Sequence, residues 1–257
     1  MLYKTEGIVL RSSEFQDADK IVTILSKNNG KIMAIAKGVR KTKSKFGSSI
    51  ENLTCANFLM YKGRNLDIIN QSQIIDSFFR TSRDLNKYAL AINAAEVINK
   101  LTIEREVNVS LYMLFKQLLI HLKTAKDPML LALSYKWKVL HNIGYKPSLS
   151  HCYICGKKNE GSKALFFRIA DGGVTCNQCA IRDKSEYLKI TEYFTRLLRR
   201  IFITPLSLIS KASIPIERIK ELENLTNIYL NYYSDNIFKS ERFLKNIQLS
   251  QDHQYDN

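Results

Sequence analysis

The chain has 257 residues, of which 45% are apolar, and its 39 basic against 24 acidic residues give a net charge of +15. With only 10 glycines and 4 prolines, this composition is typical of one or two folded domains and excludes a largely disordered chain. No apolar run approaches the roughly 18 residues of a membrane span, and the charged first 20 residues lack the apolar core of a signal peptide, so we expect no membrane contact and a cytoplasmic location.

The positive charge lies mostly in the first 150 residues. Such an asymmetry is typical of a protein with a polyanionic partner, and nucleic acid is a more common partner of this kind than anionic lipid. The alternative is an ordinary lysine-rich, solvated surface.

The first 80 residues carry the pattern of short strands. Apolar and β-branched runs occupy the ranges 3–10, 21–26, 32–38, 57–62 and 66–75. Asn29-Gly30 separates two of these runs, and both residues tolerate the positive φ of a type I′ hairpin turn. Since no helix-length pattern interrupts the runs, we predict an N-terminal domain over 1–80 that is a small β-barrel or sandwich.

The segment KGVRKTKSK, which follows the third of these runs, contains five basic residues and no acidic one. We expect it to form a loop at the rim of the barrel that attracts phosphates, with Arg11 on the same rim. The alternative is a solvated loop without a ligand. The basic residues of the loop are Lys37, Arg40, Lys41, Lys43 and Lys45.

Three aromatic residues, Phe46, Phe58 and Tyr61, are the nearest candidates for stacking on bases, although core packing is the favoured role for Phe58.

After residue 80 the apolar residues recur at helical spacing. Helices are predicted at 88–101, 111–123, 129–143, 191–203 and 216–233, with Pro128 in a first turn and Gly144 as a helix stop. We therefore predict an α+β protein with a helical domain over 81–257. In the last of these helices, one face is formed by Ile216, Ile219, Leu222, Leu225 and Tyr229.

Four of the five cysteines form two Cys-x-x-Cys pairs separated by 20 residues, inside a module at about 150–182. This spacing is typical of a zinc ribbon, in which each pair supplies two thiolates to one tetrahedral Zn²⁺. Disulfides are typical of secreted proteins, and a redox pair needs only one such motif in a βαβ context. We predict one Zn²⁺ held by Cys152, Cys155, Cys176 and Cys179.

Four thiolates close the metal shell, so this zinc is predicted to be structural and not catalytic. His151 is a weaker candidate ligand, because a residue next to Cys152 points elsewhere on the turn, and the lone Cys55 is expected to be a small core residue. Phosphate-binding loops and nucleophile–base patterns are absent from the sequence, so we predict that the protein is not an enzyme.

Almost the whole chain resembles the RecO family of bacterial DNA repair and recombination mediators. The resemblance is carried by EGIVLRSSEFQDADKIVTILSKNNGKIMAIAKGVRKTKSK, FFRTSRDLNKYALAINAAEVINKL, LLALSYKWKVLHNIGYKPSLSHCYICG and the Gly-Gly-x-x-Cys before the second cysteine pair. It implies an N-terminal OB-fold, a helical domain and a zinc-finger-like element. Some members of the family lack the cysteines, so the metal is not essential to the activity in general.

The resemblance also implies a nucleoid-associated protein of the RecF pathway that binds single- and double-stranded DNA and anneals complementary strands. The implied partners are RecR and single-stranded DNA-binding protein, whose C-terminal tail is expected to dock on the helical domain; together they help load the recombinase. The motif AKGVRK implies DNA contacts by Lys37, Arg40 and Lys41, and the motif VLRSS implies one by Arg11. Lys43 and Lys45 are assigned as DNA contacts on their charge alone. A zinc-ribbon protein associated with RNA or transcription is the alternative.

Overall fold

The computed structural model describes residues 1–39, 46–79, 84–159, 165–183, 185–234, 238–240 and 244. The chain divides into two compact units, which are described separately. Unit 1 comprises Met1–Pro128 together with Phe238–Asn257, and unit 2 comprises Met129–Ile237. Within the described residues, no helix combines the length and the apolar character needed to cross a bilayer.

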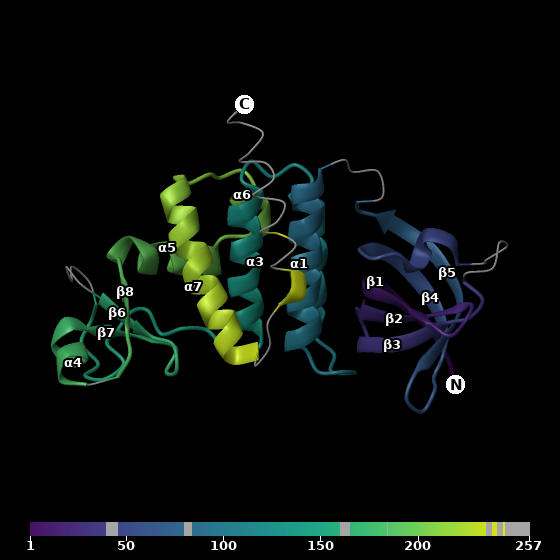
Figure 1. The fold of residues 1–257 in the computed structure, drawn as a ribbon, viewed down its shortest axis with the longest axis horizontal. Helices are drawn as coiled ribbons and strands as arrows, with labels where there is room; N and C mark the ends of the chain where they lie inside the picture. Colours follow the sequence, from purple (N-terminus) through teal and green to yellow (C-terminus); the bar gives the residue numbers. More distant parts are fainter. Residues whose placement is uncertain are drawn as a thin grey trace. The chain divides into compact units, whose positions relative to one another are not determined.

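Unit 1 begins with a closed five-stranded barrel in the order β1-β2-β3-β5-β4 (Figure 1). All neighbouring strands are antiparallel except β3 and β5, whose parallel pairing covers only Ala34↔Asp67 and Ile35↔Ile68. This architecture confirms the predicted OB-fold-like barrel. The strands are β1 (Leu2–Phe15), β2 (Asp19–Ser26), β3 (Gly30–Ala36), β4 (Thr54–Tyr61) and β5 (Asp67–Ser77).

Alternating apolar side chains fill the barrel. On β4, for example, Ala56, Phe58 and Met60 are buried, while Asn57 between them is exposed, as the two-residue period of a strand requires. The barrel core contains Val9, Val22, Ile24, Ile32, Ala34, Ala36, Phe46, Ile50, Ala56, Phe58, Met60 and Ile69.

The hairpin between β2 and β3 differs from the predicted type I′ turn. Ser26 pairs with Gly30, so three residues form the loop, and of the Asn29-Gly30 pair only Gly30 has a positive φ, +68°. A side chain at Gly30 would also collide with the backbone of the segment before α2, because its Cβ would lie 2.3 Å from the carbonyl oxygen of Glu106. Glycine is therefore required here by its conformation and by this close approach.

The chain after the basic loop returns to the barrel. A short 3₁₀ helix, η1 (Gly47–Ile50), follows Phe46, and both Phe46 and Ile50 pack into the barrel core. Phe46 is thus a core residue and not a stacking candidate, because η1 turns the chain back onto the barrel.

Two helices complete the main part of unit 1. α1 (Leu85–Leu101) begins after Asp84, whose side chain accepts a hydrogen bond from the Lys87 N–H, and α2 (Val109–Leu122) begins after Asn108, which caps the Leu111 N–H in the same way. These N-caps satisfy backbone donors that a helix leaves unpaired at its start. The predicted helices 88–101 and 111–123 are confirmed.

Unit 2 contains the remaining helices and a three-stranded sheet in the order β7-β6-β8. Its core includes the single tryptophan, Trp137, whose indole N–H donates to Thr226 Oγ1 over 2.8 Å and whose ring lies 5.0 Å from that of Tyr229. The elements are α3 (Pro128–Asn142), β6 (Leu165–Arg168), β7 (Gly173–Cys176), α4 (Asn177–Arg182), β8 (Leu188–Ile190), α5 (Glu192–Ile203), α6 (Leu206–Ile209) and α7 (Ile216–Ser234).

The other predicted helices, 129–143, 191–203 and 216–233, correspond to α3, α5 and α7. On α7, four of the five residues predicted to share a face are buried, but Ile216 is 59% exposed. Ile216 is the first residue of α7, so the apolar face of the helix starts one turn later, at Ile219.

Candidate metal centre and nucleic-acid interface

The four cysteines of the two predicted pairs come together in unit 2. Cys152 and Cys155 lie on one turn, Cys176 ends β7 and Cys179 lies on α4; their sulfur atoms all lie within 4.8 Å of one another. The Sγ atoms of Cys155 and Cys176 are 3.9 Å apart, far beyond the roughly 2.05 Å of a disulfide bond. Four sulfurs at about 2.3 Å from one tetrahedral ion would lie about 3.8 Å apart. The cluster therefore fits a metal ion.

Backbone hydrogen bonds fix the first cysteine turn. The Cys152 N–H donates to the Lys157 carbonyl over 2.7 Å, and the Gly156 N–H donates back to the Cys152 carbonyl over 2.9 Å. A third bond, from Tyr153 N–H to the Val174 carbonyl at 2.9 Å, joins the turn to β7. Since β7 leads directly into Cys176, this bond also sets the position of the first pair against the second.

The electrostatics of the cluster favour thiolate at one position. Burial raises the pKa of the Cys152 thiol, but the N–H groups of Cys155, Cys176 and Ile154 outweigh burial and lower the pKa to about 6. The thiolate is the form that binds a metal ion. Cys179 has a raised pKa, about 12, because of desolvation and because its thiol donates to the other sulfurs.

The donor set of four sulfurs suits Zn²⁺ and leaves no coordination position for water or a substrate. If Zn²⁺ is bound, all four cysteines are its ligands, and the ion would hold the two turns together. His151 forms a backbone bridge with Lys158 and is not part of the sulfur cluster. Cys55, the fifth cysteine, is fully buried in unit 1, as expected of a core residue.

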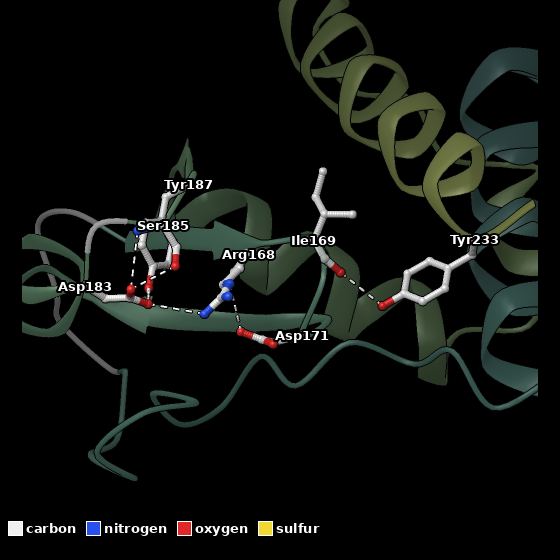
Figure 2. A network of polar contacts seen from close by, with 7 residues as sticks. All are labelled: Arg168, Ile169, Asp171, Asp183, Ser185, Tyr187 and Tyr233. Atoms are coloured by element: carbon white, nitrogen blue, oxygen red, sulfur yellow. Dashed lines mark hydrogen bonds and ion pairs between the residues drawn. The ribbon is translucent and has the colours of Figure 1, made fainter. Parts of the chain in front are cut away.

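A polar network lies on the small sheet beside the metal centre (Figure 2). Arg168 on β6 contacts two carboxylates, Asp171 at 3.1 Å and Asp183 at 3.2 Å. Asp183 also accepts hydrogen bonds from the hydroxyls of Tyr187, at 2.6 Å, and Ser185, at 2.8 Å. The hydrogen bond from Tyr187 lowers the pKa of Asp183 the most, and the one from Ser185 lowers it further, so the carboxyl group stays ionised. The network ties the chain after α4 back to β6.

The predicted DNA-contact residues are only partly described. Arg11 on β1 and Lys37, which directly follows β3, both have exposed side chains. Arg11 pairs with Thr23 in the middle of β2, so it does not lie on the expected rim. The antiparallel order of β1, β2 and β3 brings the end of β1, the start of β2 and the end of β3 to the same end of the barrel, next to Lys37. There the Asp19 carboxylate on β2 accepts a 2.8 Å hydrogen bond from the Gly38 N–H and fixes the exit of the basic loop.

Arg40, Lys41, Lys43 and Lys45 lie outside the described residues. Of the two remaining stacking candidates, Phe58 is buried in the barrel core, whereas Tyr61 at the end of β4 is 47% exposed.

Sequence reasoning missed three polar contacts that join the barrel to α1, α2 and the segment between them. The first is made by Lys31 on β3, whose ammonium donates to the carbonyls of Asn99 and Thr102, 2.6 Å from each, at the end of α1. A helix C-terminus has unpaired carbonyls and a partial negative charge, so a buried ammonium is stabilised there.

The second contact centres on Glu6 of β1. Its carboxylate accepts hydrogen bonds from Lys116 and Tyr112 of α2, each over 2.6 Å, and these bonds lower its pKa. The Tyr112 hydroxyl also lies 3.6 Å from the sulfur of Cys55.

The third contact centres on Asp67, at the start of β5, whose side chain is fully buried. It accepts hydrogen bonds from Tyr3 at 2.5 Å, from Arg105 at 2.8 Å and from the Gly63 N–H at 2.9 Å. Burial alone would raise the pKa of Asp67, but these hydrogen bonds outweigh it and lower the pKa. Together the three contacts make the barrel and the first two helices one unit.

Comparison with known proteins accounts for both halves of the chain. The family model described as "Recombination protein O N terminal" matches residues 1–78, and the one described as "Recombination protein O C terminal" matches residues 82–242. The chain belongs to the RecO family. RecO is a DNA repair protein that acts as a recombination mediator and not as an enzyme.

Curated relatives match the chain over nearly its whole length. It is 30% identical over 244 residues to the DNA repair protein RecO of Listeria innocua, and this alignment covers 95% of this chain and 94% of that protein. It is 31% identical over 250 residues to the DNA repair protein RecO of Thermoanaerobacter sp., covering 96% of this chain and 98% of the relative. These matches cover the barrel, the helices and the cysteine module together.

Proposed function

We propose that this protein binds single- and double-stranded DNA and anneals complementary strands in the RecF pathway of recombinational repair. With RecR, it helps load the recombinase onto DNA coated by single-stranded DNA-binding protein, in the cytoplasm at the nucleoid. The observation that carries this proposal is the match of both halves of the chain to the RecO family models. Two exposed basic residues of the OB-like barrel, Arg11 on β1 and Lys37 directly after β3, support it.

In this proposal, different segments of the chain have different roles. Residues 1–80 are the DNA-binding domain, and residues 81–257 are a helical domain that receives the acidic C-terminal tail of the single-strand binder. The module at about 150–182 holds one structural Zn²⁺. The phosphate contacts are made by Arg11, Lys37, Arg40, Lys41, Lys43 and Lys45.

The deciding experiment is the annealing of complementary oligonucleotides that are precoated with single-stranded DNA-binding protein, measured with and without RecR. The protein is expected to accelerate pairing of the coated strands, and RecR to promote recombinase loading on them. Filter binding with DNA and RNA of the same sequence tests the alternative, because a protein associated with RNA or transcription should prefer the RNA.

The basic loop should contribute through phosphate charge and not through reading of bases. The triple change Lys37→Ala, Arg40→Ala and Lys41→Ala is expected to weaken binding to all sequences about equally and to slow annealing. Each lost phosphate contact should lower the slope of log affinity against log salt by roughly 0.7 for single strands, so the triple change should flatten it by up to about 2. Titrations at several salt concentrations measure this slope.

The matched control is the double change Lys211→Ala and Lys220→Ala, which removes two exposed lysines from unit 2. It should leave the slope unchanged, and the melting temperature of both variants should stay close to that of the parent, because exposed charges usually matter within about 0.5 kcal/mol for folding. An unchanged slope in the triple variant would move the DNA site away from this loop.

A further inference from the structure

The first cysteine turn exposes two apolar side chains at its tip. Tyr153 is 56% exposed and Ile154 is 47% exposed, and both lie between the ligand candidates Cys152 and Cys155. The backbone hydrogen bonds and sulfur atoms that hold this turn do not involve either side chain. Neither side chain is therefore needed to hold the sulfur cluster, and both are accessible to a partner.

The ring of Tyr153 is held in place before any contact is made. The Tyr153 N–H is bonded to Val174 of β7, and a Cβ on Gly173 would lie 3.0 Å from Tyr153 Cβ and 3.3 Å from both Cγ and Cδ2. The base of the side chain thus rests on the glycine backbone, with more than half of its surface open to solvent. An aromatic ring that is already positioned loses little conformational entropy when a flat partner stacks on it.

Basic side chains follow the turn. Lys157 and Lys158 come after Cys155 and are exposed, and Glu160 lies outside the described residues. Four thiolates around Zn²⁺ leave two negative charges on the centre, which the two lysines offset. Downstream of the turn, the first two carboxylates of the described chain, Asp171 and Asp183, are both engaged by Arg168 (Figure 2). An exposed aromatic ring on a turn that also carries exposed lysines is a combination with which proteins bind single-stranded nucleic acid, by base stacking and phosphate attraction.

We propose that this turn is a second contact for single-stranded DNA, in which the Tyr153 ring stacks on a base and Lys157 contacts a phosphate. The inference rests on the DNA-annealing function proposed above. Annealing requires that two strands of like charge be held at once. A contact on unit 2, in addition to the barrel of unit 1, binds the second strand separately.

The direct test is fluorescence. The change Tyr153→Trp introduces an exposed indole, and the single native tryptophan, Trp137, is fully buried and serves as a constant background. Addition of oligothymidine to the zinc-loaded full chain should quench the new emission, because stacking on a base quenches an indole. Tyr232→Trp, at a site on α7 that is 52% exposed, is the matched control and should not be quenched.

The functional test compares Tyr153→Ala with Tyr153→Phe. Loss of the ring should weaken single-strand binding by about fivefold or more and slow annealing, with the salt slope unchanged, whereas phenylalanine should retain both activities. Lys157→Ala should lower the salt slope by roughly 0.7. All variants should bind the parental amount of zinc, which elemental analysis measures, because none of them removes a ligand.

The outcomes separate the inference from the proposed function. If the parent protein neither binds nor anneals DNA, the proposed function is wrong. If the parent anneals DNA but Tyr153→Trp is not quenched and Tyr153→Ala anneals normally, only the second contact is refuted. If Tyr153→Ala anneals naked strands normally and fails only on strands coated with the single-strand binder, the turn docks a protein instead of DNA.

Discussion

Removal of the metal should unfold the module around the cysteines while the barrel stays folded. The strands β6, β7 and β8 have four, four and three residues, which is too little sheet to be stable alone. In such a module most of the folding free energy comes from the metal, about 10–16 kcal/mol for zinc-finger peptides near neutral pH. Protein purified without added metal should contain about one zinc per chain, and Cys152→Ala should lose it to a chelator.

Limited proteolysis and calorimetry measure this effect. In Cys152→Ala, cleavage should concentrate between residues 146 and 183, and the salt slope of DNA binding through the barrel should persist. Cys55→Ala is the matched control, since Cys55 lies outside the sulfur cluster, and it should keep the full zinc content. Zinc that stays bound to Cys152→Ala in the presence of chelator would contradict the four-cysteine site.

The second large effect is expected at Asp67. The change Asp67→Ala removes a fully buried carboxylate and leaves Tyr3 and Arg105 without their partner, which should destabilise unit 1 by about 3–5 kcal/mol. Asp76→Ala, on the same strand, is the matched control. Asp76 forms an exposed ion pair with Lys123 at 3.5 Å, and such pairs contribute at most about 1 kcal/mol. Urea unfolding of the full chain measures both changes.

The same residue predicts a dependence on pH. Because the pKa of Asp67 is lower in the folded protein than its ordinary 3.8, its stabilising effect is present above that value and is lost as the pH falls through the folded pKa. The parent should therefore lose stability below about pH 4 more steeply than Asp67→Ala does. Parallel acid-unfolding curves for the two proteins would contradict the role of the carboxylate.

The sequence predicts those features of the fold and the metal site that depend on the spacing of residues along a short segment. The strands, the helices and the four metal ligands follow from spacing along the chain. The contacts of Lys31, Glu6 and Asp67 could not be predicted, because Lys31 and Thr102 are 71 residues apart and Glu6 and Lys116 are 110 residues apart. Nothing in the local pattern distinguishes these charges from solvated ones. The burial of Phe46 could not be predicted for a related reason, because it follows a lysine-rich segment while its packing partners lie on distant strands.

The two ends of the chain belong to one unit, with unit 2 between them in the sequence. Near the C-terminus, the N–H groups of Lys239 and Ser240 donate to the Glu96 carboxylate of α1, at 3.0 and 2.8 Å, and the buried amide of Asn93 donates to Ser240 Oγ over 2.8 Å. During synthesis on the ribosome, α1 emerges long before these partners do. Unit 1 therefore cannot finish folding until nearly the whole polypeptide has left the exit tunnel. A premature stop before Phe238 would leave Asn93 and Glu96 of α1 without these partners, in a form that proteolytic quality control can remove.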